Sequence, residues 1–334
     1  MLQGSDHKFG FISDYLVEIF HTVNLAFLAG IISVLGIVAN ILNIVVFLKQ
    51  GFNDTVNISL FALAVSDLCA LITLQWVNLL RNPLFIYRVP FLPDEVQHLT
   101  AAWPHACFAR ITSWITVYIT LERCLCVVVP LKVKRIVNPT VAVCVLVSIF
   151  LVMFLTLLPD YLTCYLDWKF DSTYNRTMLG LLFLKGRDQM AALSFNLAAC
   201  TQISSFGAVI VFTSVLVIKV KEKSKWRSSI AHSGANSSAV ISKRDNKVVK
   251  MIVLIAVIYC ICFLPMLVNY ILTTIEPNFI VVGLYRNAFL LSWSFAFLVD
   301  SINSSINIIV YYKMSSKFRN TFNTLFFTTT PIKN

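Results

Sequence analysis

Seven apolar segments, each about 20 residues or longer, limit the fold of this chain more than any other feature of its sequence. A helix of about 20 mostly apolar residues is long enough to cross the hydrocarbon core of a bilayer. The segments cover residues 23–48, 57–80, 103–129, 139–162, 189–219, 248–274 and 284–312. The chain is 58% hydrophobic and only 13% charged, whereas about a quarter of a soluble domain is charged. The sequence therefore predicts an all-α membrane protein, a seven-transmembrane helix bundle over residues 23–313.

The distribution of basic residues indicates how this bundle is oriented. The net charge of +11 would by itself suit a nucleic-acid partner, but the charges gather in particular loops. With the N-terminus outside, 17 Lys and Arg residues lie in cytoplasmic segments and eight in external ones, and Arg110 and Arg123 inside the spans complete the 27. Cytoplasmic loops of membrane proteins carry such an excess. We therefore predict a multi-pass plasma-membrane protein in the lipid bilayer, with an extracellular N-terminus (1–22), a cytoplasmic tail (314–334) and no nucleic-acid partner.

Two short features lie outside the spans. Asn175 begins the sequence Asn-Arg-Thr in a loop assigned to the outside, so we expect it to be glycosylated. In the tail, Phe318, Phe322, Leu325 and Phe326 recur at helical spacing beside basic residues. This pattern predicts a short amphipathic eighth helix that lies on the membrane surface.

Polar side chains form a stripe along the seventh span. They recur at steps of three and four residues, and they are Asp300, Asn303, Ser304, Asn307 and Tyr311. Buried polar groups in lipid need partners, and we expect Asp67 in the second span and Asn40 in the first to supply them. One carboxylate with several neutral oxygens suits a hard cation. We therefore predict a sodium site and no other cofactor; its residues are Asp67, Thr112, Asn303, Ser304 and Asn307. A hydrogen-bonded polar core without an ion is the alternative.

Charged and kinked positions mark the third and sixth spans. Glu122 and Arg123 stand side by side at the end of the third span, where a buried charge is costly unless it is paired. Asp245 is the one acid in the basic stretch before the sixth span, and we expect it to pair with Arg123. Pro265 removes a helical hydrogen bond and predicts a kink in the sixth span, with Phe263 close to the hinge.

Together, these motifs resemble those of rhodopsin-like (class A) G protein-coupled receptors. The matching pieces are Asn40, Leu63-Ala64-Val65-Ser66-Asp67, Glu122-Arg123-Cys124 with Pro130, Tyr259-x-x-Cys262-Phe263-x-Pro265, and Asn303-Ser304-x-x-Asn307 with Tyr311. The segments Asn57-Ile58-Ser59-Leu60 and Trp114-Ile115-Thr116 are similar to molluscan (lophotrochozoan) chemosensory receptors. Two departures are Ile308, where the family has a proline, and Cys124, where it has a tyrosine.

The resemblance implies a receptor that binds an extracellular ligand between helices 3, 5, 6 and 7. It would activate a heterotrimeric G protein by an outward movement of helix 6. We expect a chemosensory receptor; a neuropeptide receptor of the same family is one alternative and a membrane transporter is another. We expect no enzymatic activity, because the five His residues are scattered and form no converging acid–base or metal set.

The resemblance also implies which side chains line the ligand pocket. They are His105, Arg110, Tyr270, Trp293 and Asp300. His105 stands where amine receptors carry an Asp, which disfavours an amine ligand. Arg110 and Asp300 lie at similar depth, at a rise of about 1.5 Å per residue. Arg110 would therefore either bind an acidic group of the ligand (a small acid, an amino acid or a peptide) or form a bridge to Asp300.

Activation switches and partners follow from the same resemblance. The switches are Glu122, Arg123, Asp245, Phe263, Pro265, Asn307 and Tyr311. Ligand binding would break the Arg123–Asp245 pair and open a cytoplasmic cleft for the G protein. The Ser-rich third cytoplasmic loop and residues 328–330, all Thr, suit phosphorylation by a receptor kinase and binding of arrestin.

The family's disulfide joins the top of helix 3 to the second external loop. In this chain His98 stands at that position of helix 3, and Cys107 lies nine residues deeper. Cys107 and Cys164 are the two cysteines on the external side, and we predict that they form a disulfide.

Overall fold

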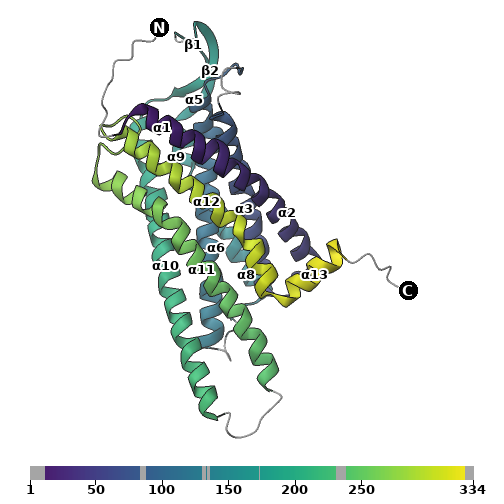
Figure 1. The fold of residues 1–334 in the computed structure, drawn as a ribbon. Helices are drawn as coiled ribbons and strands as arrows, with labels where there is room; N and C mark the ends of the chain where they lie inside the picture. Colours follow the sequence, from purple (N-terminus) through teal and green to yellow (C-terminus); the bar gives the residue numbers. More distant parts are fainter. Residues whose placement is uncertain are drawn as a thin grey trace.

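The chain forms a bundle of long helices that run side by side, with a β-hairpin at one end and a short helix at the other (Figure 1). The computed structural model describes residues 12–82, 88–129, 133, 136–172, 174–230 and 238–327, and it describes side chains outside 223–230 and 238–246. Within these residues, seven helices are long and apolar enough to cross a membrane. We call the two ends of the bundle the hairpin end and, after the short helix α13 (Ser316–Phe326), the α13 end.

Each of the seven helices is built from one or more segments. The first comprises α1 (Asp14–His21), the π-helical η1 (Thr22–Ala29) and α2 (Gly30–Gln50), and the second is α3 (Thr55–Leu80). The third comprises α5 (Pro93–Gln97), the π-helical η2 (His98–Ala102) and α6 (Trp103–Val128). The fourth is α8 (Pro139–Leu155), followed by the single turn α9 (Leu158–Tyr161). The others are α10 (Arg187–Ile230), α11 (Ser238–Ile275) and α12 (Arg286–Met314), and the short α13 (Ser316–Phe326) follows.

The seven predicted spans correspond to these helices, but three helices begin about ten residues earlier than we expected. The first begins at Asp14, where the Ser13 side chain caps it by accepting a hydrogen bond from the backbone N–H of Leu16. The third begins at Pro93 rather than at Trp103, and Pro93 occupies its first turn, where a missing N–H costs nothing. The sixth begins at Ser238 rather than at residue 248. Hydropathy detects only the part of a helix that crosses hydrocarbon, so it missed these extensions.

The sequence did not predict the β-hairpin that lies at one end of the bundle. Strands β1 (Cys164–Asp171) and β2 (Arg176–Phe183) pair antiparallel, with Cys164 opposite Phe183. Asn175 lies in the turn with a φ of 48°, a conformation that Asn tolerates better than most residues, and its side chain is exposed. The exposed position leaves Asn175 accessible, and its glycosylation stays a prediction.

The first, second and seventh helices approach each other closely at Gly36. A Cβ atom placed there would lie 2.0 Å from Ser305 Oγ and 2.7 Å from Leu71 Cδ1, so no larger residue fits without displacing a neighbour. One turn further along, Asn40 Nδ2 donates to the carbonyl oxygen of Ser304 at 2.7 Å. This bond confirms the expected link between the first helix and the polar stripe of the seventh.

The amphipathic eighth helix is present as α13. The Ser315 hydroxyl caps it by accepting the N–H of Phe318 at 3.2 Å. Phe318 is buried against Phe47 and Tyr311, with ring centroids 5.4 Å and 5.6 Å away, whereas Phe326 is exposed. The apolar anchor therefore ties α13 to the ends of the first and seventh helices.

Candidate functional site

The buried carboxylate of Asp67 joins the second, third and seventh helices. Thr112 Oγ1 donates to its Oδ1 at 2.9 Å, and Asn307 Nδ2 donates to its Oδ2 at 2.8 Å. The Ser304 hydroxyl lies beside the same carboxylate. Asn303 is buried at the neighbouring position, but no hydrogen bond joins it to Asp67 in the described part of the chain. Four of the five residues predicted for the sodium site therefore meet around one carboxylate.

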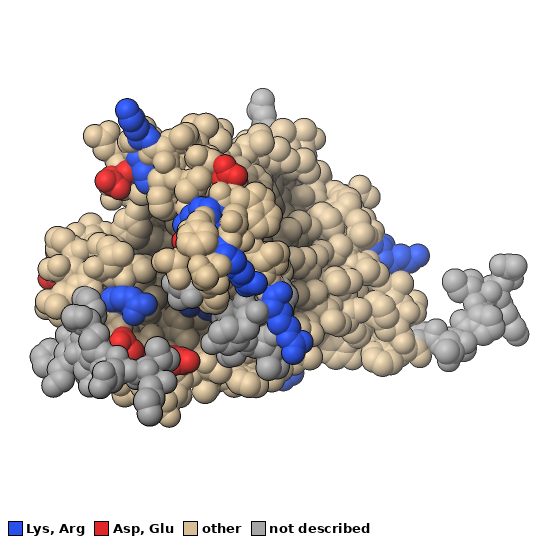
Figure 2. All heavy atoms as spheres, turned by 90° about the horizontal axis from the view of Figure 1, so that it is seen from above, with Lys and Arg blue, Asp and Glu red and all other residues tan. Residues whose placement is uncertain are grey.

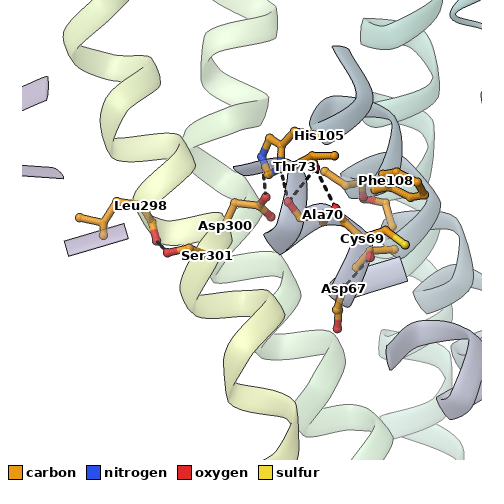
Figure 3. A network of polar contacts seen from close by, with 12 residues as sticks. Asp67, Cys69, Ala70, Thr73, His105, Phe108, Leu298, Asp300 and Ser301 are labelled. Atoms are coloured by element: carbon orange, nitrogen blue, oxygen red, sulfur yellow. Dashed lines mark hydrogen bonds and ion pairs between the residues drawn. The ribbon is translucent and has the colours of Figure 1, made fainter. Parts of the chain in front are cut away.

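A second buried polar contact lies nearer the hairpin end, where His105 of α6 stands between α3 and α12 (Figure 3). Its Nδ1 lies 3.0 Å from the carbonyl oxygen of Ala70, and its Nε2 lies 3.2 Å from Asp300 Oδ2. The His105 ring also packs edge-on against Phe297, with centroids 5.3 Å apart. His105 and Asp300 are 1% and 2% exposed, so water does not screen this contact.

One hydrogen-bond direction at His105 is fixed by its partner. A carbonyl oxygen only accepts, so Nδ1 of His105 must carry the hydrogen that points at Ala70. Nε2 lies at ion-pair distance from Asp300 Oδ2, but neither atom makes a hydrogen bond with acceptable angles to a described residue. The His105–Asp300 pair is therefore defined by its short distance and its burial.

Arg110 lies five residues further along α6 and does not join this pair. Its side chain is 1% exposed, and none of its three guanidinium nitrogens has a hydrogen-bond partner among the described residues. The bridge to Asp300 that we considered is absent, because Asp300 pairs with His105 instead. That Arg110 and Asp300 lie at equal depth was not sufficient to make them a pair. Five residues along an α-helix rotate the side-chain direction by about 140°, so His105 and Arg110 project in different directions.

An aromatic wall connects the His105–Asp300 pair to a cavity at the hairpin end. Trp293 and Phe297 of α12 line a cavity of about 180 Å³ that also reaches Arg81. Their rings lie 5.6 Å apart, and Tyr270 packs edge-on against Trp293, also at 5.6 Å. Burial lowers the pKa of the Arg81 guanidinium, and the nearby Asp94 opposes this effect.

The face that surrounds this cavity carries few charges. From above the hairpin end, basic and acidic side chains are scattered among a majority of uncharged ones (Figure 2). Of the five predicted pocket residues, Trp293 lines the cavity and Tyr270 packs behind it. His105, Arg110 and Asp300 lie outside its lining.

Glu122 and Arg123 form an ion pair at the α13 end, as we expected from their side-by-side positions. Glu122 also accepts hydrogen bonds from two hydroxyl groups of α3, Thr55 Oγ1 and Ser59 Oγ, the second at 3.4 Å. We did not predict these partners; the only signal was two hydroxyl residues in the first turns of an apolar helix. The Asp245 side chain lies outside the described residues, so its pairing with Arg123 stays a prediction.

The remaining predicted switches lie around a second cavity and along α11. Tyr311 lines a cavity of about 300 Å³ at the α13 end, together with Asn57 and Met251. Phe263 is buried and its ring lies 4.5 Å from that of Tyr259, and Pro265 lies inside α11 as expected.

The predicted disulfide between Cys107 and Cys164 is wrong in this structure, where both are free thiols. Cys107 lies in the central core, whereas Cys164 packs against Leu99 and Leu181 beneath the hairpin. Nine helical residues separate Cys107 from His98, about 13 Å along the axis, which places it too deep to reach the hairpin. Burial raises the pKa of the Cys164 thiol, although the neighbouring Arg187 guanidinium acts in the opposite direction.

Comparison with known proteins finds relatives that are receptors, in agreement with the class that the sequence motifs indicated. The chain is 24% identical over 303 residues to the Allatostatin-A receptor of Bombyx mori, covering 87% of this chain and 76% of that receptor. It is 25% identical over 314 residues to the Thyrotropin-releasing hormone receptors of Ovis aries and Homo sapiens, covering 88% of this chain and 76% of each. A family model described as serpentine type 7TM GPCR chemoreceptor Srw matches residues 24–329. The chain belongs to this family of seven-transmembrane G protein-coupled chemoreceptors.

Proposed function

We propose that this chemoreceptor recognises a ligand with an anionic group, and that Arg110 is the residue that binds it. The hairpin end faces the outside of the plasma membrane in this proposal, because that orientation places the excess of basic residues in the cytoplasm. Ligand binding then drives G protein activation at the α13 end.

The observation that supports this proposal is the unpartnered guanidinium of Arg110. Its side chain is 1% exposed and its three nitrogens have no hydrogen-bond partner among the described residues. A buried charge without a partner costs roughly several kcal/mol of free energy. A ligand that places an anion beside Arg110 would remove this cost. A carboxylate matches the fork of an arginine with two parallel hydrogen bonds.

Other buried polar atoms on the neighbouring helices are also unpartnered. Ser194 Oγ on α10 and Asn269 Nδ2 on α11 have no hydrogen-bond partner, and both residues are at most 2% exposed. Their sequence neighbours Phe195 and Tyr270 pack on each other at 5.6 Å, in the same apolar cluster as Ala109 beside Arg110. These groups would complement an amino acid or a peptide terminus, which carries hydrogen-bond donors and acceptors beside its carboxylate.

The experiment is a screen of the expressed receptor for ligand-dependent G protein activation, first with small acids and amino acids and then with short peptides. Arg110→Gln should abolish the response to an anionic ligand, and Arg110→Lys should weaken it, because a lysine cannot form the bidentate contact. Arg176→Gln is the control, since Arg176 is an exposed basic residue of the hairpin. An unchanged potency in Arg110→Gln at normal surface expression would refute the role of Arg110.

A peptide ligand is the second candidate. The relatives found by comparison are named as receptors for allatostatin-A and for thyrotropin-releasing hormone. If neither small acids nor amino acids activate the receptor and an acidic peptide does, then the same Arg110 test applies to that peptide.

The activation step that we propose is a shift between two states of the bundle. Helix α11 moves outward about Pro265 and opens the α13 end for the G protein, and a sodium ion at Asp67 favours the resting state. Asp245→Ala should raise ligand-independent signalling; unchanged basal signalling would contradict a lock between Asp245 and Arg123. Receptor kinase and arrestin would act on the Ser-rich third loop and on residues 328–330; the second of these segments lies outside the described residues.

A further inference from the structure

Three side chains with different metal-binding atoms meet beneath the β-hairpin. They come from three segments: His98 from η2, Asp160 from α9 and Cys164 from the start of β1. One imidazole nitrogen, one carboxylate oxygen and the thiol sulfur all lie within 4.8 Å of one another. Asp160 is fully buried and Cys164 is 5% exposed, so this is not a chance encounter of solvated surface groups.

The local fold holds these three residues together independently of any ion. The single turn α9 ends at Tyr161, and β1 begins three residues later at Cys164, so Asp160 and Cys164 are fixed close together. The Thr163 hydroxyl donates to the Asp160 carbonyl at 3.2 Å and tightens this turn. Leu184 N–H donates to the Thr163 carbonyl at 2.9 Å, which ties the end of the hairpin to the same turn.

The hydrogen bonds around His98 leave two acceptors facing each other. The indole N–H of Trp103 donates to His98 Nε2 at 2.9 Å, so this nitrogen carries a lone pair and no hydrogen. Asp160 Oδ2 is also an acceptor and lies only 3.1 Å from the same nitrogen. Two converging lone pairs repel each other unless a positive charge lies beside them.

Arg187 supplies a positive charge at this place. Its NH1 lies 2.8 Å from Asp160 Oδ1, although without hydrogen-bond angles, and its NH2 donates to His98 Nε2 at 3.3 Å. The side chain is 17% exposed and its guanidinium lies 5.4 Å from the centre of the Phe183 ring. The guanidinium of Arg187 thus contacts both Asp160 and His98, so a metal ion bound by these residues would have to displace it.

We propose that His98, Asp160 and Cys164 bind a Zn²⁺ ion, and that Arg187 neutralises the cluster when the metal is absent. A nitrogen, an oxygen and a sulfur ligand are the set that zinc takes in proteins, whereas sodium and calcium take oxygen. Tetrahedral zinc places its ligand atoms about 3.3–3.8 Å apart, so the atoms found here need to move by about 1 Å at most. The thiol of Cys164 loses its proton to solvent on binding, and the fourth position is left for water or a ligand group.

The consequence is a metal bridge between the hairpin and the third helix. His98 belongs to the third helix and Cys164 to β1, so zinc would clamp the hairpin over the bundle in the way that a covalent cross-link would. The pairing between β2 and the segment before α5, seen in the hydrogen bond from Leu92 N–H to the Leu179 carbonyl at 2.9 Å, would be held by the same clamp.

The test is titration of the purified full-length receptor with Co²⁺ and with Zn²⁺. Cobalt bound by a thiolate gives a sulfur-to-metal charge-transfer absorption, which reports the ligand type directly. We expect one equivalent of cobalt with this band, its displacement by zinc, and its loss in Cys164→Ser. Cys144→Ser is the matched control, because Cys144 is exposed on the outer face of α8 and should leave the band unchanged.

Further variants keep the test decisive if Cys164→Ser does not fold. His98→Gln should weaken cobalt affinity at least about tenfold, while Arg187→Gln should strengthen it, because a competing cation has been removed. No thiolate band in the wild-type protein, or a band that persists in Cys164→Ser, would overturn the proposal. Weaker or unchanged binding in Arg187→Gln would overturn the competition between arginine and metal.

Discussion

Replacing Asp300 offers the sharpest test of how the interior of this receptor is held together. Asp300 Oδ2 lies 3.2 Å from His105 Nε2, and a pair of unit charges at this distance attract each other by about 5 kcal/mol at an effective dielectric constant of about 20. Desolvation offsets much of this attraction. Removing one partner is a different change, because it leaves the other buried without compensation, at a cost of about 3–5 kcal/mol.

Two substitutions of Asp300 separate the effect of its charge on stability from the effect of its side-chain size. Asp300→Ala should cost about 3–5 kcal/mol, since His105 then faces an empty space. Asp300→Asn keeps the size and offers an amide N–H to the lone pair of a neutral His105, so it should cost only about 1 kcal/mol. At roughly 2 °C for each kcal/mol in a chain of this length, the thermal midpoints should fall by about 6–10 °C and about 2 °C.

The assay is the thermal midpoint of the purified receptor in one fixed detergent, with a thiol-reactive dye as reporter. The single variants Asp300→Ala and His105→Ala are compared with the double variant, which removes both halves of the pair. We expect the double variant to be no less stable than either single variant. If the two losses simply add, the residues do not act as a unit and the reasoning from their pairing is refuted.

The remaining predictions concern the other contacts described above. Glu122→Gln should raise ligand-independent signalling in a G protein assay, because it weakens the contacts to Arg123 and to α3; a lower basal activity would contradict this. Gly36→Leu should abolish surface expression while Gly30→Leu should not, since a Cβ at Gly30 meets only one atom, at 3.6 Å. Ser315→Ala should speed amide hydrogen exchange in the first turn of α13, in keeping with a loss of about 1 kcal/mol of capping; equal exchange would rule out the cap. Asn175→Gln should remove the mass shift produced by glycosidase treatment of the receptor from cells, and a persistent shift would place the glycan elsewhere.

The sequence predicted those parts of the receptor that depend on periodicity. Seven apolar segments predicted seven helices, and the spacing of Asp300, Ser304 and Asn307 predicted a polar stripe that meets Asp67. These predictions succeeded because lipid forces every backbone group into helices and every buried polar group towards a partner. The signal is therefore present in each segment by itself.

The parts that were missed depend on contacts between distant segments. The hairpin is joined to α5 through Glu95, whose carboxylate accepts the N–H of Leu181 at 2.6 Å, and no local sequence pattern predicts such a bond. Similarly, depth along the helix correctly placed Arg110 and Asp300 at one level, but the direction of each side chain decided that His105 is the partner. Cys107 was paired with Cys164 because both lie towards the external side, although Cys107 lies nine residues deeper than the family's usual position at His98.

The π-helical segment η2 sets the rotational phase of everything that precedes it in the third helix. A π-helical turn holds one residue more than an α-helical turn, so the chain on its N-terminal side is shifted by about 100° relative to an unbroken α-helix. His98 stands at the first position of this segment. In an unbroken α-helix of the same residues, the His98 imidazole would be rotated away from Asp160 and the contact between the hairpin and the helix beneath it would be lost. The π-helical segment thus decides which way the outer rim of this receptor faces.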